Sequence, residues 1–359
     1  MKETNLKMIE ELTNAYGPSG FEDDVVPVLR KYTEGLGTQE EDCLRNFYLF
    51  RKENTGNKPV MMLDAHTDEV GFMVHSIRPN GTLRLMTLGN TSISALVSNS
   101  VMIRNKEGKY IPGIVASKPH HFMTAIEKAN SSSLAISDLS VDIGATSLEE
   151  AKNVFGIRIG EPVVFNTRFT YDAEHDVMMG KAFDDRIGDA CVIEVLRRLQ
   201  NKELNVDVVG DFSVQEEVSE RGAQVACNRV KPDICICFEG CPADDTFTPD
   251  YAIQTALKKG PMLRFMDMSV ICSPRFQRFC LDLAEKYNMP VQSSVREGGG
   301  NNGAVINCYG KGVPTVVFGV PVRYIHSANC ITSYYDFEAT VELAVKVIEE
   351  LNAEIIAQF

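Results

Sequence analysis

The sequence predicts an α/β fold whose main domain is interrupted by a small inserted β-domain. Apolar strand-like runs alternate with amphipathic helical segments near both ends of the 359-residue chain, which is the pattern of an α/β sheet. Between about residues 72 and 165, short β-like runs separated by turns replace that alternation. We therefore expect residues 1–71 and 166–359 to form one discontinuous domain and residues 72–165 to form the insertion.

The composition argues against several classes of protein. A formal net charge of −13 leaves no basic face for phosphates, so we expect no nucleic acid partner. No apolar run reaches the roughly 18 residues of a membrane span, and the N-terminus lacks the apolar core of a signal peptide. We therefore expect a cytoplasmic protein without a membrane partner. The ten cysteines, several in apolar runs, are expected to be reduced.

Two helices and a buried strand are predicted before the insertion. Apolar residues recur at helical spacing over residues 4–15, and Gly17-Pro18-Ser19-Gly20 ends this helix. A second helix is expected over residues 23–33. Met61-Met62-Leu63 then predicts a buried strand.

A histidine and an aspartate follow that strand at a spacing that suggests a site. Ligands of α/β proteins gather at the carboxyl ends of strands. His66 is a candidate metal ligand there. Asp68, two residues later, is a candidate to hold the His66 imidazole in position through a hydrogen bond.

The insertion is predicted to contain hairpins. Asn80-Gly81 is a turn signal between two runs of β-forming residues. The strands expected here are 73–78, 83–88, 101–104 and 110–115. The polar stretch 119–133 is expected to be a loop.

The α/β pattern returns after Tyr171. The expected strands are 206–213, 234–238 and 314–319, and the expected helices are about 188–199, 273–287 and 337–357. A glycine-rich loop at 296–304 precedes a short helix. The helix at the end carries its apolar residues on one face, which we expect to pack on the sheet.

Acidic residues and histidines come directly after these strands or beside them. They are His66, Asp68, Asp184, Asp185, Glu216, Glu217, Glu239 and His326. Two divalent cations about 3.5–4 Å apart need a shared carboxylate, with a histidine and a further carboxylate on each ion. Mixed histidine and carboxylate ligation suits zinc, cobalt or manganese. Another carboxylate must remain off the metals to take a proton from water. Taken singly, each residue has an ordinary alternative as a helix cap, a turn or a satisfied core side chain.

At this point the chain resembles a known family, the cytosolic tetrahedral aminopeptidases. This family includes deblocking and glutamyl aminopeptidases, and some members are labelled endoglucanases. The resemblance covers nearly the whole chain. Its motifs are Gly17-Pro18-Ser19-Gly20-Phe21-Glu22, Asp64-Ala65-His66-Thr67-Asp68-Glu69-Val70-Gly71, Gly180-Lys181-Ala182-Phe183-Asp184-Asp185-Arg186, Gln215-Glu216-Glu217-Val218 and Arg323-Tyr324-Ile325-His326-Ser327.

The resemblance implies an architecture and an assembly. The main domain would be a mixed-sheet, three-layer metallopeptidase domain. The insertion would be a small β-barrel used for dimerisation, and six dimers would build a hollow tetrahedral dodecamer. The substrates would be short peptides that lose their N-terminal residues.

The resemblance also implies a role for each site residue. His66, Asp184 and Glu239 would hold one divalent metal ion, and Asp184, Glu217 and His326 the other. Zinc is the first choice, with cobalt and manganese as alternatives. Glu216 would be the general base, Asp68 would orient His66, and the peptide bond between Asp184 and Asp185 would be cis. No substrate-binding residue is singled out.

Three departures from the family pattern and two rival functions remain. Glu239 stands where an aspartate is common, Asn301-Asn302 replaces Thr-Asp and is expected to remove a charge near the substrate, and Ala328 follows Ser327 instead of proline.

One rival is an endoglucanase-type glycoside hydrolase, which the two histidines disfavour because glycosidases use two carboxylates and usually no metal. The other rival is a catalytically idle member of the fold.

Overall fold

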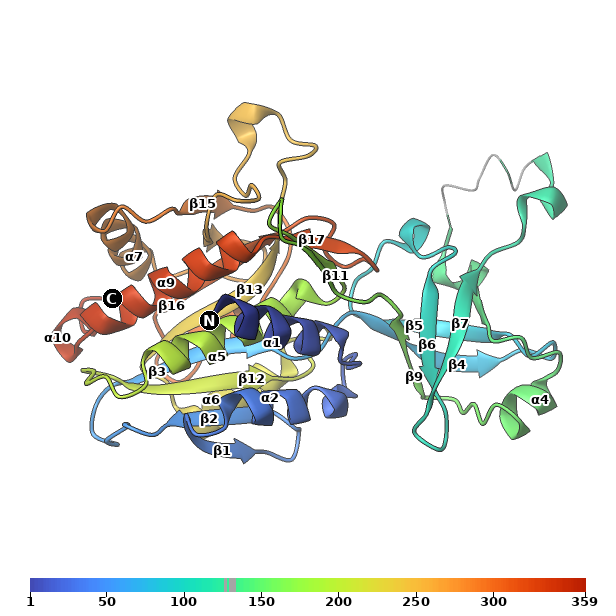
Figure 1. Cartoon of the computed structure of the whole chain (residues 1–359), viewed down its shortest axis with the longest axis horizontal. Coiled ribbons are helices and arrows are strands. Elements are labelled where there is room, and N and C mark those ends of the chain that lie inside the picture. Colours follow the sequence, from blue (N-terminus) through green and yellow to red (C-terminus); the bar gives the residue numbers. More distant parts are fainter. Residues whose placement is uncertain (126–127, 129–133) are drawn as a thin grey trace.

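The computed structural model describes residues 1–125, 128 and 134–359 and shows two lobes (Figure 1). The larger lobe is built on a mixed eight-stranded sheet of order β1-β2-β12-β3-β13-β16-β14-β15. Its strands are β1 Gly37–Glu41, β2 Phe47–Arg51, β3 Val60–His66, β12 Asp207–Ser213, β13 Ile234–Pro242, β14 Met262–Met266, β15 Gln292–Val295 and β16 Thr315–Val322.

The centre of this sheet is parallel. Strands β12, β3, β13 and β16 run in the same direction. Strand β2 runs antiparallel to both of its neighbours, whereas β14 runs antiparallel to β16 and parallel to β15. The four parallel strands are buried along almost their whole length, as strands covered on both faces should be. Their carboxyl ends therefore meet at one edge, where the loops that follow them can form a site.

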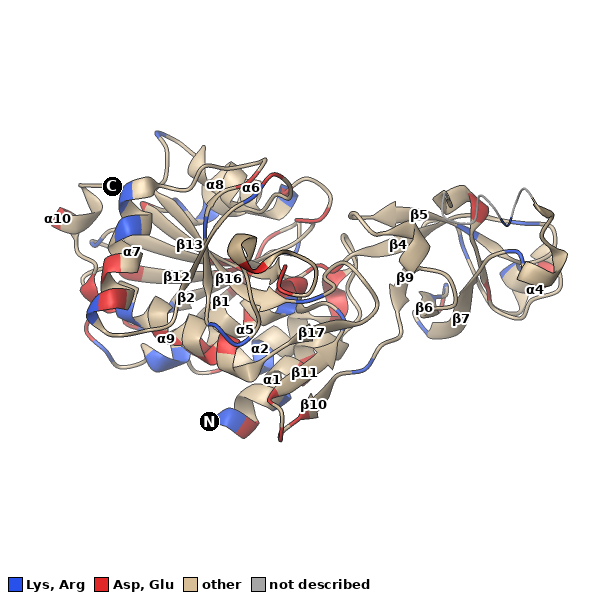
Figure 2. Ribbon diagram, turned by 90° about the horizontal axis from the view of Figure 1, so that it is seen from above, with Lys and Arg blue, Asp and Glu red and all other residues tan. Residues whose placement is uncertain are grey.

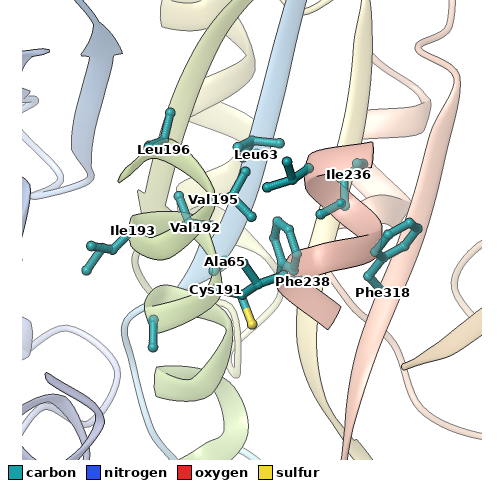
Figure 3. Close-up of a cluster of buried hydrophobic side chains, with 14 of the residues drawn as sticks. Leu63, Ala65, Cys191, Val192, Ile193, Val195, Leu196, Ile236, Phe238 and Phe318 are labelled. Atoms are coloured by element: carbon teal, nitrogen blue, oxygen red, sulfur yellow. The ribbon is translucent and has the colours of Figure 1, made fainter. Parts of the chain in front are cut away.

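Helices cover both faces of the sheet. On one face lie α1 Lys2–Asn14, α2 Val26–Thr33, α5 Phe183–Arg198, α7 Pro274–Lys286 and α9 Tyr334–Glu350, and on the other α6 Arg221–Val230 and α8 Gly303–Asn307. The short α10 Ala353–Ile356 ends the chain. Figure 3 shows how the apolar face of α5, with Cys191 and Val195, packs on Leu63 and Phe238 of the sheet. This packing fixes the start of α5 beside the strand ends.

The smaller lobe is a closed antiparallel barrel of order β4-β5-β8-β7-β6-β9. Its strands are β4 Gly71–Ile77, β5 Leu83–Leu88, β6 Ser100–Arg104, β7 Tyr110–Ala116, β8 Ser140–Asp142 and β9 Pro162–Phe165, with α4 Leu148–Asn153 at one end. The predicted Asn80-Gly81 hairpin is confirmed: Gly81 has φ +88°, and a Cβ there would lie 2.8 Å from the Ala145 carbonyl. Of the loop predicted at 119–133, residues 126–127 and 129–133 lie outside the described residues, and the described part includes a 3-10 turn at His120–Phe122.

A three-stranded sheet lies between the lobes. It consists of β10 Thr170–Asp172, β11 Val177–Gly180 and β17 Cys330–Thr332. The pairing of Gly180 with Cys330 brings the segment before α5 next to the segment that follows β16. Asp184 and His326 are thereby carried to the same place.

The predicted fold class is confirmed, with differences in detail. Strand β13 continues to Pro242, so Glu239 lies inside a strand and not after one. Strands β1 and β2 were not predicted. All ten cysteines are free, as expected. Lys and Arg are interspersed with Asp and Glu over both lobes (Figure 2). Within the described part of the chain, no helix is both long enough and apolar enough to cross a membrane.

Candidate metal centre

Loops and strand ends of the central sheet converge on one cavity of about 1330 Å³. His66 is the last residue of β3, Glu239 lies near the end of β13, and Glu216 follows β12. The predicted site residues that line the cavity are Asp184, Glu216, Glu217, Glu239 and His326. The structure therefore brings together residues that lie as far as 260 positions apart, from 66 to 326.

Asp184 lies at the centre of this group. Its Oδ1 is 3.0 Å from Nε2 of His66, and its Oδ2 is 3.0 Å from Nε2 of His326. Each oxygen of one carboxylate thus faces a different histidine, which is the arrangement that a shared ligand requires. The peptide bond between Asp184 and Asp185 is cis, as the resemblance implied.

The donor atoms of the described residues form three overlapping groups, with all atoms of a group within 4.8 Å of one another. The first is Asp184, Glu217 and His326, the second is His66, Glu216 and Glu239, and the third is Asp184, Asp185 and Glu239. Nε2 of His66 lies 4.0 Å from Glu239 and 3.7 Å from Glu216. The first group has the predicted members. In the second, the expected base Glu216 lies as close to His66 as the expected ligand Glu239.

Burial disfavours the charged form of most of these carboxylates, so a nearby positive charge would favour their ionisation. Burial raises the pKa of Glu216 and Glu239 well above the usual range and that of Glu217 to about 8. Burial also opposes ionisation of Asp184, but hydrogen bonds to His326 and His66 hold its pKa below the usual range.

No lysine or arginine among the described residues forms an ion pair with these carboxylates, and Oε1 of Glu217 has no hydrogen-bond partner. Buried charges are expected to be paired or to coordinate metals. A set of histidine nitrogens and carboxylate oxygens therefore fits divalent cations such as zinc.

Both histidines are held through their Nδ1 atoms. Nδ1 of His66 lies 3.1 Å from the Asp68 carbonyl and 3.4 Å from Asp68 Oδ1. Nδ1 of His326 lies 2.6 Å from the Asn90 carbonyl. When Nδ1–H donates to these oxygens, Nε2 is left unprotonated and available to a metal ion.

Asp68 also supports the neighbouring loop, which the sequence did not reveal. Its carboxylate accepts hydrogen bonds from Ser19 Oγ and from the backbone N–H groups of Glu216 and Glu217. Burial opposes its ionisation, but its contact with His66 and these hydrogen bonds lower the pKa of Asp68. Asp68 therefore contacts both His66 and the backbone of Glu216 and Glu217.

Asp185 turns out to organise the backbone around the cavity. Its buried carboxylate accepts hydrogen bonds from the N–H groups of His66, Gly188 and Gly240. Gly240 must be small, because a Cβ there would lie 2.3 Å from the Phe183 carbonyl oxygen. The Asp-Asp pair was visible in the sequence, but these backbone partners were not.

The expectation for Asn302 was wrong about its position. The side chain is 1% exposed and does not line the cavity. Its Nδ2 donates hydrogen bonds to Asp64 and to Ser213 Oγ in the interior. The departure from the family pattern therefore removes a charge from the sheet interior, where Asp64 already lies next to the buried Asp211, and not from the substrate cavity. Other cavity-lining residues that sequence reasoning missed include Arg264 and Arg296.

Comparison with known proteins places this architecture among the aminopeptidases, which are hydrolases. A family model described as M42 glutamyl aminopeptidase matches residues 46–343, and the chain belongs to this family. The chain is 33% identical to the glutamyl aminopeptidase of Lactococcus lactis subsp. cremoris over 351 residues, which cover 98% of this chain and 97% of that protein.

Solved structures agree with the family assignment. A TET aminopeptidase from a marine sediment archaeon of the Thaumarchaeota matches with a TM-score of 0.94 and 35% identity over 99% of both chains. The Pyrococcus horikoshii TET1 peptidase, which can assemble into a tetrahedron or a large octahedral shell, matches with a TM-score of 0.85 and 26% identity over 97% of this chain and 100% of that chain. A Thermotoga maritima structure described as an endoglucanase matches at 0.76 and 27% over 98% of both chains.

Proposed function

We propose that this protein is a dinuclear metal-dependent aminopeptidase that removes N-terminal residues from short cytoplasmic peptides. The observation that carries the proposal is the Asp184 carboxylate, whose two oxygens each face a histidine Nε2 at 3.0 Å among buried carboxylates. His66, Asp184 and Glu239 would hold one ion, and Asp184, Glu217 and His326 the other. Zinc is the first candidate, with cobalt and manganese as alternatives.

In this proposal the protein's own groups position the substrate and move the proton. Bound divalent cations would polarise the scissile carbonyl and lower the pKa of water. Glu216 is the general base, because it lines the cavity beside the proposed ligands and is itself assigned to neither ion. The same carboxyl then donates the proton to the leaving amine. Asp68 fixes the His66 ring and the backbone that carries Glu216.

We also propose that the barrel of strands β4 to β9 is a dimerisation domain and that dimers build a dodecamer. The support is the Pyrococcus horikoshii relative, whose chain assembles into closed shells. Closed homo-oligomers need a repeated interface. Light scattering of the purified protein would measure the mass, and deletion of the barrel should leave a smaller species.

The test of the activity is hydrolysis of a panel of amino-acyl p-nitroanilides after chelation and after addition of zinc, cobalt or manganese. Cleavage that is lost with the chelator and restored by one of these ions is the expected result. Two bound ions per chain without cleavage of any substrate would contradict the proposal and favour an idle assembly.

An endoglucanase is the second candidate, because one structural neighbour carries that description. Glycoside hydrolysis relies on two carboxylates flanking the bond and leaves His66 and His326 without a role. Glucan cleavage that persists after complete chelation, with no peptide cleavage, would replace the aminopeptidase with this function.

A further inference from the structure

The motif Gly17-Pro18-Ser19-Gly20-Phe21-Glu22 forms a loop that contacts the metal centre from outside the sheet. Ser19 reaches Asp68 through its hydroxyl at 2.6 Å. Glu22 is only 4% exposed, although the other two residues of its short 3-10 turn, Asp23 and Asp24, are exposed. A buried carboxyl in such a place needs specific partners.

Both partners of Glu22 that the hydrogen bonds identify are backbone N–H groups. Its Oε1 accepts a hydrogen bond from Gly20 N at 2.7 Å and from Gln215 N at 3.2 Å. The second bond links the N-terminal loop to the segment that begins the Gln215-Glu216-Glu217 turn. Glu22 therefore touches the loop that carries the proposed base, although it does not line the cavity.

The turn at Gln215 has a backbone that is suited to bind acids. Gln215 has φ 58°, in the left-handed region. Successive N–H groups in such a turn point to one side and form a concave site for anionic groups. Here the N–H of Gln215 donates to Glu22, and the N–H groups of Glu216 and Glu217 donate to Asp68. Two carboxyl groups thus hold three consecutive N–H groups.

We propose that Glu22 is a positioning residue that sets the backbone of the Gln215–Glu217 turn and so aims Glu216 at the reacting groups. The inference about catalysis rests on the proposed function, in which Glu216 is the base. The inference about the turn rests only on the contacts above.

An accepting oxygen, and not a negative charge, is what the turn requires. Burial, with the negative charge of Asp68 as a further cause, raises the pKa of Glu22 to about 8. A neutral carboxyl at pH 7 is matched closely by glutamine, which keeps an accepting oxygen at the same reach. Alanine removes the oxygen, and aspartate keeps the acid but shortens the arm.

Loss of the acceptor should disturb catalysis more than binding. Without Glu22, the Gln215 N–H loses its partner, and Asp68 is the remaining carboxyl that holds N–H groups of the turn. Hydrogen bonds to the carbonyls of Gln215 and Glu216 are kept, so we expect a shift of the turn and not its unfolding. A misplacement of about 1 Å in a catalytic group can cost about 100-fold in rate. We therefore expect Glu22→Ala to lower kcat by about 10- to 100-fold, with KM within about twofold of the wild type.

The test compares Glu22→Ala and Glu22→Gln with a matched control, Asp207→Ala. Asp207 is also buried and accepts backbone N–H groups, but it lies at the opposite end of β12. For each full-length protein, metal content, kcat and KM are measured on the metal-loaded form. Amide hydrogen exchange of residues 214–220 is measured by mass spectrometry on both metal-loaded and metal-free forms.

The expected result is faster exchange at 214–220 and a lower kcat in Glu22→Ala, with two ions retained, and recovery of both properties in Glu22→Gln. Asp207→Ala should leave exchange at 214–220 and kcat unchanged. Unaltered exchange in a folded Glu22→Ala protein, or a kcat equal to the wild type, would overturn the proposal.

Two further outcomes are also decisive. If Glu22→Ala does not fold, Glu22→Gln must lie closer to the wild type than Glu22→Asp in exchange and kcat, and the reverse order would refute the proposal. If the wild type itself cleaves no peptide with any metal, the proposed function fails. The exchange data then decide alone whether Glu22 holds the turn.

Discussion

Two acids near the opposite ends of strand β12 differ in their hydrogen bonding. At the amino end, the Asp207 carboxylate accepts hydrogen bonds from the N–H groups of Thr55 and Gly56. Beyond the carboxyl end, Glu217 leaves Oε1 without a hydrogen-bond partner. We call an acid satisfied when its carboxylate accepts hydrogen bonds from N–H groups, as Asp207 does, and unsatisfied when an oxygen lacks such a partner, as in Glu217.

The difference separates structural acids from functional ones. A carboxylate that accepts backbone N–H groups is stabilised by those groups and needs no cation. The carboxylates of the candidate metal centre are slightly less buried, and their ion-pair partners among the described residues are histidines. Burial without hydrogen-bond donors does not identify a site by itself, because Asp189 and Asp211 are buried in the same way. The site is identified by carboxylates and histidine nitrogens that converge on one cavity.

The largest effect is expected when Asp184, the central acid of the unsatisfied group, is replaced. Asp184→Ala should lose both metal ions and all aminopeptidase activity, because each of its oxygens faces one histidine. Metal analysis after dialysis and a p-nitroanilide assay measure the two effects. Glu297→Ala is the control, since Glu297 is an exposed acid of the same cavity and should keep both ions. Retention of two ions by Asp184→Ala would refute the shared-ligand role.

The next largest effect is expected at the proposed base. Glu216→Gln keeps the size of the side chain but cannot take a proton, so kcat should fall by about 10²- to 10⁴-fold. The metal content should stay at the wild-type value. Loss of an ion would instead make Glu216 a ligand, which its 3.7 Å distance from His66 makes geometrically plausible. Wild-type turnover would rule out both roles.

At the satisfied end of β12, a change should affect stability and not activity. Asp207→Ala leaves the N–H groups of Thr55 and Gly56 without their acceptor. We expect a loss of about 1–3 kcal/mol in the free energy of unfolding, with kcat and metal content unchanged. Urea unfolding and the peptide assay measure these quantities. A drop in kcat without a loss of stability would show that the two ends of the strand are coupled.

The sequence was informative about the acids because strands and their ends leave a local pattern. His66, Glu216 and Glu217 follow apolar runs, and the parallel order of the central strands brings those ends together. The sequence was less informative about what each acid touches. Glu22 meets Gln215 across 193 positions, and only the packed fold brings the two together.

The same limit explains the error at Asn302. The glycine-rich loop before it lines the cavity, so a neighbouring polar residue was expected to do so as well. The chain instead turns inward at the start of α8, where Asn302 Nδ2 finds Asp64 and Ser213. In a turn, neighbouring side chains can point to opposite sides of the sheet edge. The local sequence does not predict which side chain points to the cavity and which to the interior.

A fourth prediction tests a satisfied acid whose ionisation is still costly. Asp336 accepts hydrogen bonds from the N–H groups of Lys258 and Gly260 and from Ser333 Oγ. Burial nevertheless raises its pKa from 3.8 to about 6. Between these two values the unfolded chain has released the proton that the folded protein keeps. The contribution of Asp336 to stability is therefore complete below about pH 3.8 and is lost as the pH rises through about 6.

Asp336→Asn cannot titrate, so the stability of the wild type relative to this variant should fall by about 2 kcal/mol between pH 4 and pH 7. All other titrating groups are common to both proteins and cancel in the difference. Unfolding midpoints at matched protein concentration across this range measure it. A difference that is constant with pH, or that grows as the pH rises, would show that the backbone N–H groups fully offset the burial of Asp336. Hydrogen bonds from backbone N–H groups would then be sufficient to keep a buried carboxylate ionised without a cation.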